Sequence, residues 1–337
     1  MPRLPVDTIV QTNPIITSHI GYNIPWLIFD TGAETDHDGY GNGFDNAYFN
    51  GTGANTNLQY QIDVLRNNNV KYIRLWLNIY HYMNADKDTV GYTSFRDGFL
   101  TNLATYCDWC DARGIKMLIC LDDGWYTFPW TWVNDAPKKA SYIQACSDVV
   151  TALKDKPAVW GWDYCNEPYM GWSWSVVDST THTHQQDSVY GPHDIGYDRT
   201  YLTNFFKELY GQLKAIAPTH LFSVGSTTPP YQDSYDLSRW DIKNAVDFYQ
   251  VHYYATNPST IRYSASEFDK PVIVGEYGHS GDAVGYTSNT DVMMRFTKIL
   301  LNKGFLMVMP WSSNSSRTRN GVNNYAMNSM LSVLNSF

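Results

Sequence analysis

The chain has 337 residues and a formal net charge of -9, with 17% charged residues and 15% aromatic residues. Roughly 25% charged residues is usual for globular domains. An acidic chain without a run of Lys or Arg is a poor partner for nucleic acid, and the many aromatic residues exclude an intrinsically disordered chain. Tyr and Trp combine an apolar ring with a polar tip, so the composition favours neutral, hydroxyl-rich ligands such as sugars.

Eight short apolar runs, each bounded by turn residues, predict strands along the chain. Most of them are nearly continuous, which is typical of parallel strands that are buried on both faces. The runs are 15–20, 70–77, 115–121, 158–165, 220–224, 246–253, 271–277 and 305–311.

Segments with helical periodicity alternate with these runs, and two of them end at a glycine, Gly114 and Gly304, which is a helix C-terminal signal. The segments are 56–67, 95–113, 141–153, 199–216 and 289–302. This alternation predicts an α/β fold, a closed (β/α)8 TIM barrel, as a single domain over residues 1–337. A doubly wound open sheet is the alternative, but its glycine fingerprint is absent from the sequence.

The longest predicted loops follow strands one, three, four and eight, at 21–55, 122–138, 169–198 and 312–324. All four would lie at the C-terminal face of the barrel, where active sites are built. Six tryptophans fall at this rim and suggest stacking subsites for a polymer, although some would instead anchor the loops. They are Trp125, Trp130, Trp132, Trp172, Trp174 and Trp311.

Two glutamates end predicted strands. Glu167 follows strand four in the sequence Asn166-Glu167-Pro168, and Glu276 ends strand seven in Gly-Glu-Tyr-Gly. Either glutamate alone could be an ion-pair or capping residue, but a barrel brings both strand ends to one rim. Two carboxylates across a cleft are what glycoside hydrolysis requires, because one protonates the leaving oxygen and the other attacks the sugar or activates water.

These two motifs resemble the clan of retaining (β/α)8 glycoside hydrolases, and within it glycoside hydrolase family 5, the cellulase and β-mannanase type. The resemblance covers the whole chain as a strand order and these short motifs as sequence. It implies that Glu167 is the acid/base, that Glu276 is the nucleophile, and that Asn166 holds the 2-hydroxyl of the sugar. A retaining mechanism requires carboxyl groups about 5–5.5 Å apart.

Four further positions match the family. Arg74, near the end of strand two, would pin the nucleophile by its charge and its fork of N–H groups. His252 and Tyr254, after strand six, fit a His-x-Tyr pattern in which Tyr254 donates to the nucleophile and His252 contacts the substrate or the acid/base. Trp311, after strand eight, corresponds to the platform beneath the sugar.

The sequence departs from the family after strand three, where the usual His is missing and the chain reads Asp122-Asp123-Gly-Trp125. Asp122 or Asp123 could replace that His as an acceptor for a sugar hydroxyl, or could cap the loop. Tyr169 stands where fungal-type mannanases carry an Arg. Trp125 and, in the fourth loop, Trp172 are the aromatic residues that we expect beside the substrate.

The expected activity is therefore that of a retaining endo-β-glycanase, with a polysaccharide such as β-mannan or β-glucan as its partner. An exo-acting β-glycosidase, or an enzyme for another glycan of the same clan, is the alternative within the enzyme class. A non-catalytic sugar-binding barrel is the alternative outside it, and the presence of the full residue set disfavours it. Endo action requires an open groove, and exo action requires a blocked pocket.

No cofactor and no metal are expected, because double displacement needs neither. The segment Asp36–Gly41 resembles a calcium loop, but Tyr40 and Ala47 stand where ligands are required. The chain contains no stretch of 18 apolar residues, so no membrane span is expected. No signal peptide is visible at its N-terminus. The enzyme is nevertheless expected to be extracellular, and it is expected to be a monomer.

The five cysteines lie in apolar or helical stretches, at 107, 110, 120, 146 and 165. We expect them to be buried thiols. Cys107 and Cys110 form a C-x-x-C, but they lie near the end of a helix. A redox pair would instead require the N-terminus, where a thiolate is stabilised.

Overall fold

The computed structural model describes residues 20–24, 43–44, 46–49, 54–84, 86–124, 130–168, 199–225, 242–255, 257–261, 263–278 and 290–311. Most of the four predicted long loops lies outside the described residues. So do the calcium-like segment, Tyr169 and three of the rim tryptophans, namely Trp125, Trp172 and Trp174.

The described residues form eight parallel strands in two sheets, ordered β1-β2-β3-β4-β5 and β6-β7-β8. Every strand pair is in parallel register. The strands are β1 Tyr22–Ile24, β2 Tyr72–Trp76, β3 Lys116–Cys120, β4 Val159–Asp163, β5 Leu221–Ser223, β6 Tyr249–Tyr254, β7 Val272–Gly278 and β8 Val308–Pro310.

The two sheets meet at both seams. Between β8 and β1, the Gly21 amide donates to the Val308 carbonyl at 3.0 Å, and Ile20 forms a parallel bridge with Val308. Between β5 and β6, the Asp247 amide donates to the Phe222 carbonyl at 2.8 Å. The strands therefore close a ring, and the predicted (β/α)8 barrel is confirmed.

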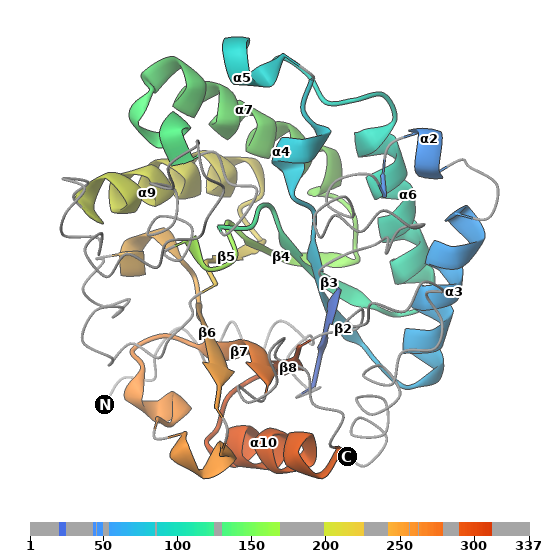
Figure 1. Ribbon diagram of the computed structural model, residues 1–337, viewed down its shortest axis with the longest axis vertical. Helices are drawn as coiled ribbons and strands as arrows, with labels where there is room; N and C mark the ends of the chain where they lie inside the picture. The colour runs from blue at the N-terminus through green and yellow to red at the C-terminus, as the bar shows by residue number, and fades with distance from the viewer. Residues whose placement is uncertain are drawn as a thin grey trace, which may run out of the picture.

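Helices surround this ring and cover its outer face (Figure 1). The α-helices are α2 Asn46–Phe49, α3 Ala54–Asn67, α4 Ile79–Tyr82, α5 Lys87–Val90, α6 Phe99–Ala112, α7 Ala136–Leu153, α9 Arg199–Ile216 and α10 Thr290–Asn302. The 3-10 helices are η2 Trp130–Asn134, η4 Ile242–Ala245, η5 Pro258–Thr260 and η6 Ala265–Glu267.

The strands bury side chains on both faces, which explains their nearly continuous apolar sequence. One face packs against the helices in the main hydrophobic core. A smaller cluster from the other face fills the inside of the barrel, and consists of Tyr72, Leu118, Trp160, Phe248, Ile273, Met307 and Met309. Arg74, two residues after Tyr72, has the same strand parity and is fully buried. The apolar interior thus gives way to polar side chains at the C-terminal ends of the strands.

The first strand lies a few residues later than the sequence predicts. The prediction was 15–20, but β1 is Tyr22–Ile24, inside the segment assigned to the first loop. The central residue of β1 is the polar Asn23, so this segment is not an apolar run in the sequence. Asn23 is nevertheless fully buried, because its side-chain amide donates to the carbonyl groups of Gly275 at 2.8 Å and Pro310 at 3.2 Å.

No helical segment is predicted from the sequence between strands six and seven. The described residues there contain only the short 3-10 helices η5 and η6. Helix α7 begins five residues before the predicted start at 141. Its N-cap Asp135 accepts a hydrogen bond from the Lys138 amide at 3.2 Å, and a proline stands in the first turn, which is the sequence signature of a helix start.

All five cysteines are buried free thiols, as expected. Burial raises the pKa of Cys107 to about 12 and that of Cys110 well above its ordinary value. Neither thiol of the C-x-x-C therefore forms a thiolate near neutral pH. Within the described part of the chain, every helix is too short or too polar to cross a membrane.

Candidate active site

Glu167 stands just beyond β4 in a left-handed backbone conformation, with φ of +43°. This conformation is costly for a residue with a side chain and is found where the surroundings enforce it. The Asn166 amide donates to the Asp122 carbonyl at 2.8 Å, and the Gly124 amide donates to the Asn166 carbonyl at 2.7 Å. A Cβ on Gly124 would lie 2.5 Å from the Glu167 carbonyl oxygen, so the close approach that holds Glu167 requires glycine at 124.

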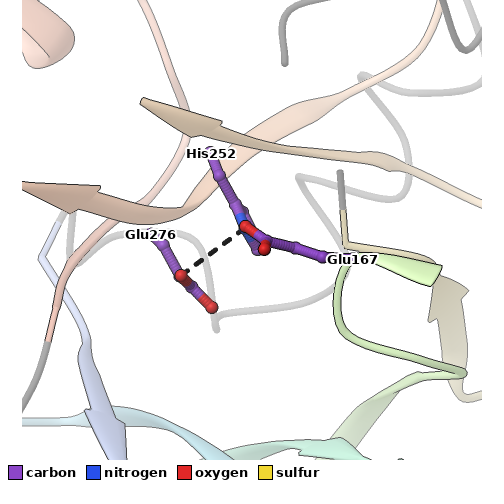
Figure 2. A group of neighbouring side chains, drawn as sticks. All are labelled: Glu167, His252 and Glu276. Carbon is purple, nitrogen blue, oxygen red and sulfur yellow. Dashed lines mark hydrogen bonds and ion pairs between the residues drawn. The ribbon is translucent and has the colours of Figure 1, made fainter. Parts of the chain in front are cut away.

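Glu276 lies in β7 and is paired in register with His252 of β6. Both side chains are buried, and Glu167 reaches them from the opposite side of the barrel mouth (Figure 2). His252 Nδ1 lies 2.6 Å from Glu167 Oε1 and 3.6 Å from Glu276 Oε2. One carboxylate oxygen of Glu167 and one of Glu276 lie within 4.8 Å of each other. The two glutamates predicted from the sequence are therefore brought together.

Arg74 and Tyr254 each bind one oxygen of the Glu276 carboxylate. Arg74 Nη1 donates to Oε1 at 2.8 Å, and the Tyr254 hydroxyl donates to Oε2 at 2.7 Å. These contacts match the expectation from the family. Burial raises the pKa of Glu276 above its ordinary value and the charge on Glu167 adds to this effect, whereas His252, Arg74 and the Tyr254 hydrogen bond oppose it. The carboxylate is thus fixed at both oxygens but is not made strongly acidic.

Asn166 has its side-chain amide fixed at both ends. Its Oδ1 accepts a hydrogen bond from Arg74 Nη2 at 2.8 Å, and its Nδ2 donates to Asp123 Oδ1 at 3.1 Å. An amide nitrogen carries two protons, so Nδ2 retains a second donor for a ligand. Asp122 is fully buried and accepts a hydrogen bond from the Tyr142 hydroxyl of α7 at 2.9 Å. The two aspartates thus differ: Asp123 orients a site residue, and Asp122 faces a helix.

Trp311 is partly exposed at the end of β8, and its ring centroid lies 5.1 Å from that of the buried Trp76. The Arg74 guanidinium lies 5.2 Å from the Trp76 ring centroid, so Trp76 links Trp311 to the buried charge network. Trp132, grouped with the rim tryptophans in the sequence, is only 3% exposed and packs against Tyr80. It is a packing residue, because a buried ring offers no face to a ligand.

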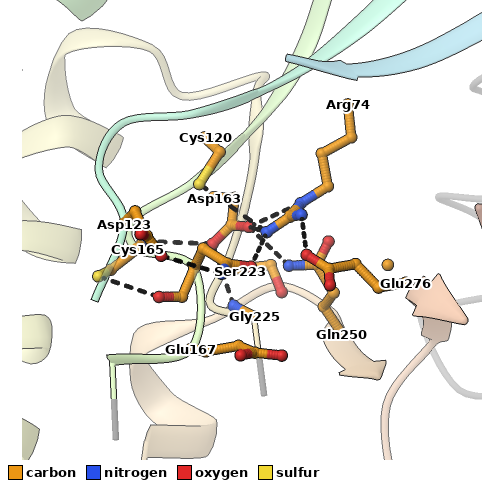
Figure 3. Close-up of polar contacts among 12 residues, drawn as sticks. Arg74, Cys120, Asp123, Asp163, Cys165, Glu167, Ser223, Gly225, Gln250 and Glu276 are labelled. Atoms are coloured by element: carbon orange, nitrogen blue, oxygen red, sulfur yellow. Dashed lines mark hydrogen bonds and ion pairs between the residues drawn. The ribbon is translucent and has the colours of Figure 1, made fainter. Parts of the chain in front are cut away.

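Sequence reasoning missed four residues of this network, which Figure 3 draws in part. They are Asn23, Asp163, Gly225 and Gln250. Asp163 carried a readable signal, because a charged residue within a strand that is buried on both faces is costly unless it is paired. Asn23, Gln250 and Gly225 carried none, since an isolated amide or glycine near a strand has many ordinary structural uses.

Glu167, His252 and Glu276 each offer an atom that could bind a metal ion. Two features argue against a resident ion. The 2.6 Å between His252 Nδ1 and Glu167 Oε1 is a hydrogen-bond distance, shorter than the roughly 3.3 Å between two ligands of a tetrahedral zinc ion. The guanidinium of Arg74 lies 2.8 Å from Glu276, and its positive charge opposes the binding of a cation there. The arrangement suits proton transfer between fixed side chains.

Comparison with known proteins gives a consistent result. Mannan endo-1,4-beta-mannosidase from Cryptopygus antarcticus is 22% identical over 317 residues, covering 86% of this chain and 81% of the relative. Among solved structures, endo-1,4-beta-mannanase from Eisenia fetida has a TM-score of 0.68 at 20% identity, covering 94% of this chain and 90% of that one. Beta-mannanase from the blue mussel Mytilus edulis has a TM-score of 0.66 at 20% identity, with the same coverage. These structural likenesses show the fold.

The family assignment rests on a separate match. Residues 36–317, most of the chain, match the family Cellulase (glycosyl hydrolase family 5). This span includes both glutamates and every other predicted site residue. The chain therefore belongs to glycosyl hydrolase family 5.

Proposed function

We propose that this chain hydrolyses internal β-1,4 linkages of a β-mannan with retention of configuration, using Glu276 as the nucleophile and Glu167 as the acid/base. The separation of the two carboxylates carries the proposal, since one oxygen of each lies within 4.8 Å of the other. Retaining glycosidases hold their carboxyl groups about 5–5.5 Å apart, whereas inverting enzymes need about 6.5–9.5 Å to admit a water molecule.

In the first step, Glu276 attacks the anomeric carbon while Glu167 donates its proton to the leaving glycosidic oxygen. The bond from carbon to that oxygen breaks, and an ester between the sugar and Glu276 forms. Arg74 and Tyr254 hold one oxygen each of the attacking carboxylate, so it meets the sugar in a fixed orientation. Asn166 would offer its remaining amide proton to the 2-hydroxyl, as the family resemblance implies.

In the second step, Glu167 removes a proton from a water molecule, which attacks the same carbon and releases Glu276. The charge on Glu276 is absent while the ester exists, so Glu167 is then free to ionise. His252 supports both states of Glu167. It is neutral near pH 7, because burial lowers its pKa to about 4, and its Nδ1 accepts from a protonated carboxyl or, in the other tautomer, donates to a carboxylate.

Four further features of the function are part of the proposal. β-Mannan is preferred to β-glucan as the substrate because the relatives named above are mannanases by name. An extracellular location follows from a substrate too large to enter a cell. The partly exposed Trp311 supports a sugar platform at the site. A monomer is expected, because all the proposed chemistry lies within one chain.

Incubation of the purified protein with soluble β-mannan, carboxymethyl cellulose and xylan, followed by sizing of the products, tests the proposal. Endo action on mannan predicts a rapid fall in viscosity and a ladder of oligosaccharides, whereas exo action releases small products with little change in viscosity. Nuclear magnetic resonance of the first products should show the β anomer, as retention requires. Glu276→Ala and Glu167→Ala should each abolish hydrolysis.

The same experiment separates the alternatives. A first product with the α anomer would contradict the double displacement. Binding of mannan without any hydrolysis would identify the non-catalytic sugar-binding barrel. Preference for carboxymethyl cellulose would retain the mechanism and overturn the choice of sugar.

A further inference from the structure

Asp163, the last residue of β4, is a fully buried carboxylate that lies beneath the proposed catalytic pair and contacts neither of them in any hydrogen bond between described residues. Five N–H groups donate to it. Arg74 Nε and Nη2 donate to Oδ2 at 3.0 and 2.6 Å, and Gln250 Nε2 donates to the same oxygen at 2.7 Å. The backbone amides of Cys165 and Gly225 donate to Oδ1 at 3.2 and 3.0 Å. Both oxygens of the carboxylate are therefore fixed by hydrogen bonds, three to Oδ2 and two to Oδ1.

The arginine that binds Asp163 is the one that binds Glu276 (Figure 3). Nε and Nη2 of Arg74 donate to Asp163, and Nη2 also donates to Asn166. Both Nη1 protons are used, by Glu276 at 2.8 Å and Asn23 at 3.2 Å. All five guanidinium donors are thus engaged, and one positive charge is shared between two buried carboxylates.

We propose that Asp163 is a positioning residue for the reaction, which fixes the guanidinium plane of Arg74 and, by sharing its charge, sets how strongly Arg74 stabilises the Glu276 carboxylate. This inference rests on the proposed function of Glu276. Without the negative charge of Asp163, the positive charge of Arg74 would act on Glu276 alone. The Glu276 carboxylate would then be a weaker base and a weaker nucleophile, because opposite charge favours the ionised form.

Because the charges around Glu276 influence its pKa, the inference can be tested by measuring how activity depends on pH. Substitution of Asp163 changes the charge near Glu276 without removing a group that touches it, and the thiols of Cys120 and Cys165 beside Asp163 stay uncharged because burial raises their pKa values. Among the residues that the structure describes, the titratable groups that face Glu276 are Arg74 from β2, Glu167 beyond β4, and His252 and Tyr254 from β6.

The experiment compares the pH dependence of kcat/KM on soluble β-mannan for the wild-type protein and Asp163→Asn. We expect kcat/KM at the optimum to fall about 10- to 100-fold. We also expect the acid limb of the profile, which reports ionisation of Glu276, to move to lower pH by about one unit. Gln250→Met is the matched control, because it removes a hydrogen bond to the same Asp163 oxygen but no charge. Its acid limb should stay at the wild-type pH.

A second variant covers the case in which Asp163→Asn does not fold. Asp163→Glu keeps the charge and displaces the carboxylate, so its kcat/KM should fall while its acid limb stays at the wild-type pH. An unmoved acid limb in Asp163→Asn, or a downward shift in Asp163→Glu, would overturn the role of Asp163. A wild-type protein that hydrolyses mannan without needing Glu276, tested by Glu276→Ala, would overturn the proposed function and this inference with it.

Discussion

Nδ1 of His252 lies 2.6 Å from Oε1 of Glu167, and no other hydrogen bond of the imidazole appears among the described residues. Glu167 thus has a neutral partner, because burial lowers the pKa of His252 to about 4. A neutral imidazole orients the carboxyl without the full charge that would hold it ionised. This contact matters most when Glu167 must carry a proton, at the departure of the leaving group.

Substitution of His252 with Asn should therefore impair acid catalysis. We expect kcat on β-mannan to fall about 100-fold, because the leaving oxygen of a sugar needs a proton. Hydrolysis of an aryl β-mannoside with a good leaving group should fall much less, since that group departs without one. Steady-state kinetics on both substrates checks this, with Glu167→Ala as the reference for complete loss of the acid. Equal losses on the two substrates would show that His252 acts elsewhere in the mechanism.

The same histidine should make the protein less stable in acid. Its folded-state pKa of about 4 lies below the ordinary value of 6.5, so as pH falls the unfolded chain takes up a proton before the folded one does. Its contribution to stability is complete above pH 6.5 and is lost as the pH falls toward 4, by about 3 kcal/mol in total.

Urea denaturation at several values between pH 7 and pH 4 measures this effect. As the pH is lowered from 7 to 4, the free energy of unfolding should decrease more for the wild-type protein than for His252→Asn. His81 and His220, whose pKa values are also lowered by burial, contribute to both proteins equally. Parallel curves for the two proteins would mean that His252 does not supply the pH dependence.

Much of the site could be predicted because, in a barrel of parallel strands, a residue's position in the sequence determines which end of the barrel it lies at. Glu167, Arg74 and Glu276 follow or lie in apolar runs, and parallel strands bring such ends to one rim. The contacts of Arg74 and Tyr254 with Glu276 followed from the family resemblance. Element boundaries were less accurate, and β1 was misplaced because its polar Asn23 is satisfied by carbonyl groups from strands late in the chain.

The network beneath the rim could not be predicted. Arg74 and Gln250 both donate to Asp163, across sequence separations of 89 and 87 residues. No local pattern encodes such a meeting. The burial of Trp132 depends in the same way on its contact with Tyr80 of another segment. Sequence identifies which residues reach the rim, and packing decides which of them face the ligand.

Gly225 should be indispensable for the geometry of the network. A Cβ at this position would lie 3.0 Å from Gln250 Nε2 and 3.2 Å from both Arg74 Nη2 and His252 Nε2. Gly225→Ala should therefore push on all three side chains and lower kcat/KM at least about 10-fold. The control is Gly211→Ala in α9, an exposed position with no atom within 4 Å of the added Cβ.

The control should change stability in the favourable direction, by about 0.5–1 kcal/mol, because glycine weakens a helix relative to alanine. Thermal melts and kinetics on β-mannan for both variants test the pair. Full activity in Gly225→Ala would show that the three side chains have room to move. Loss of activity in Gly211→Ala would show that the assay responds to substitutions far from the site.

Neutralising Glu276 should stabilise the fold while abolishing activity. Burial raises the pKa of Glu276, so the folded protein keeps the proton to a higher pH than the unfolded chain does. Ionisation of Glu276 therefore lowers the free energy of unfolding as the pH rises through the folded-state pKa. This loss of stability is present at pH 7 and absent in acid. Glu276→Gln removes this cost, while Arg74 keeps its ion pair with Asp163.

We expect a higher Tm for Glu276→Gln than for the wild-type protein at pH 7, and a difference that shrinks toward pH 4. Glu208→Gln is the matched control, because its ion pair with Lys139 is partly exposed at the surface and surface ion pairs contribute little. A Tm lowered equally at both pH values would indicate that the contacts of Glu276 with Arg74 and Tyr254 outweigh its burial. A raised Tm together with lost hydrolysis would mean that this buried carboxylate is retained for catalysis at the expense of stability.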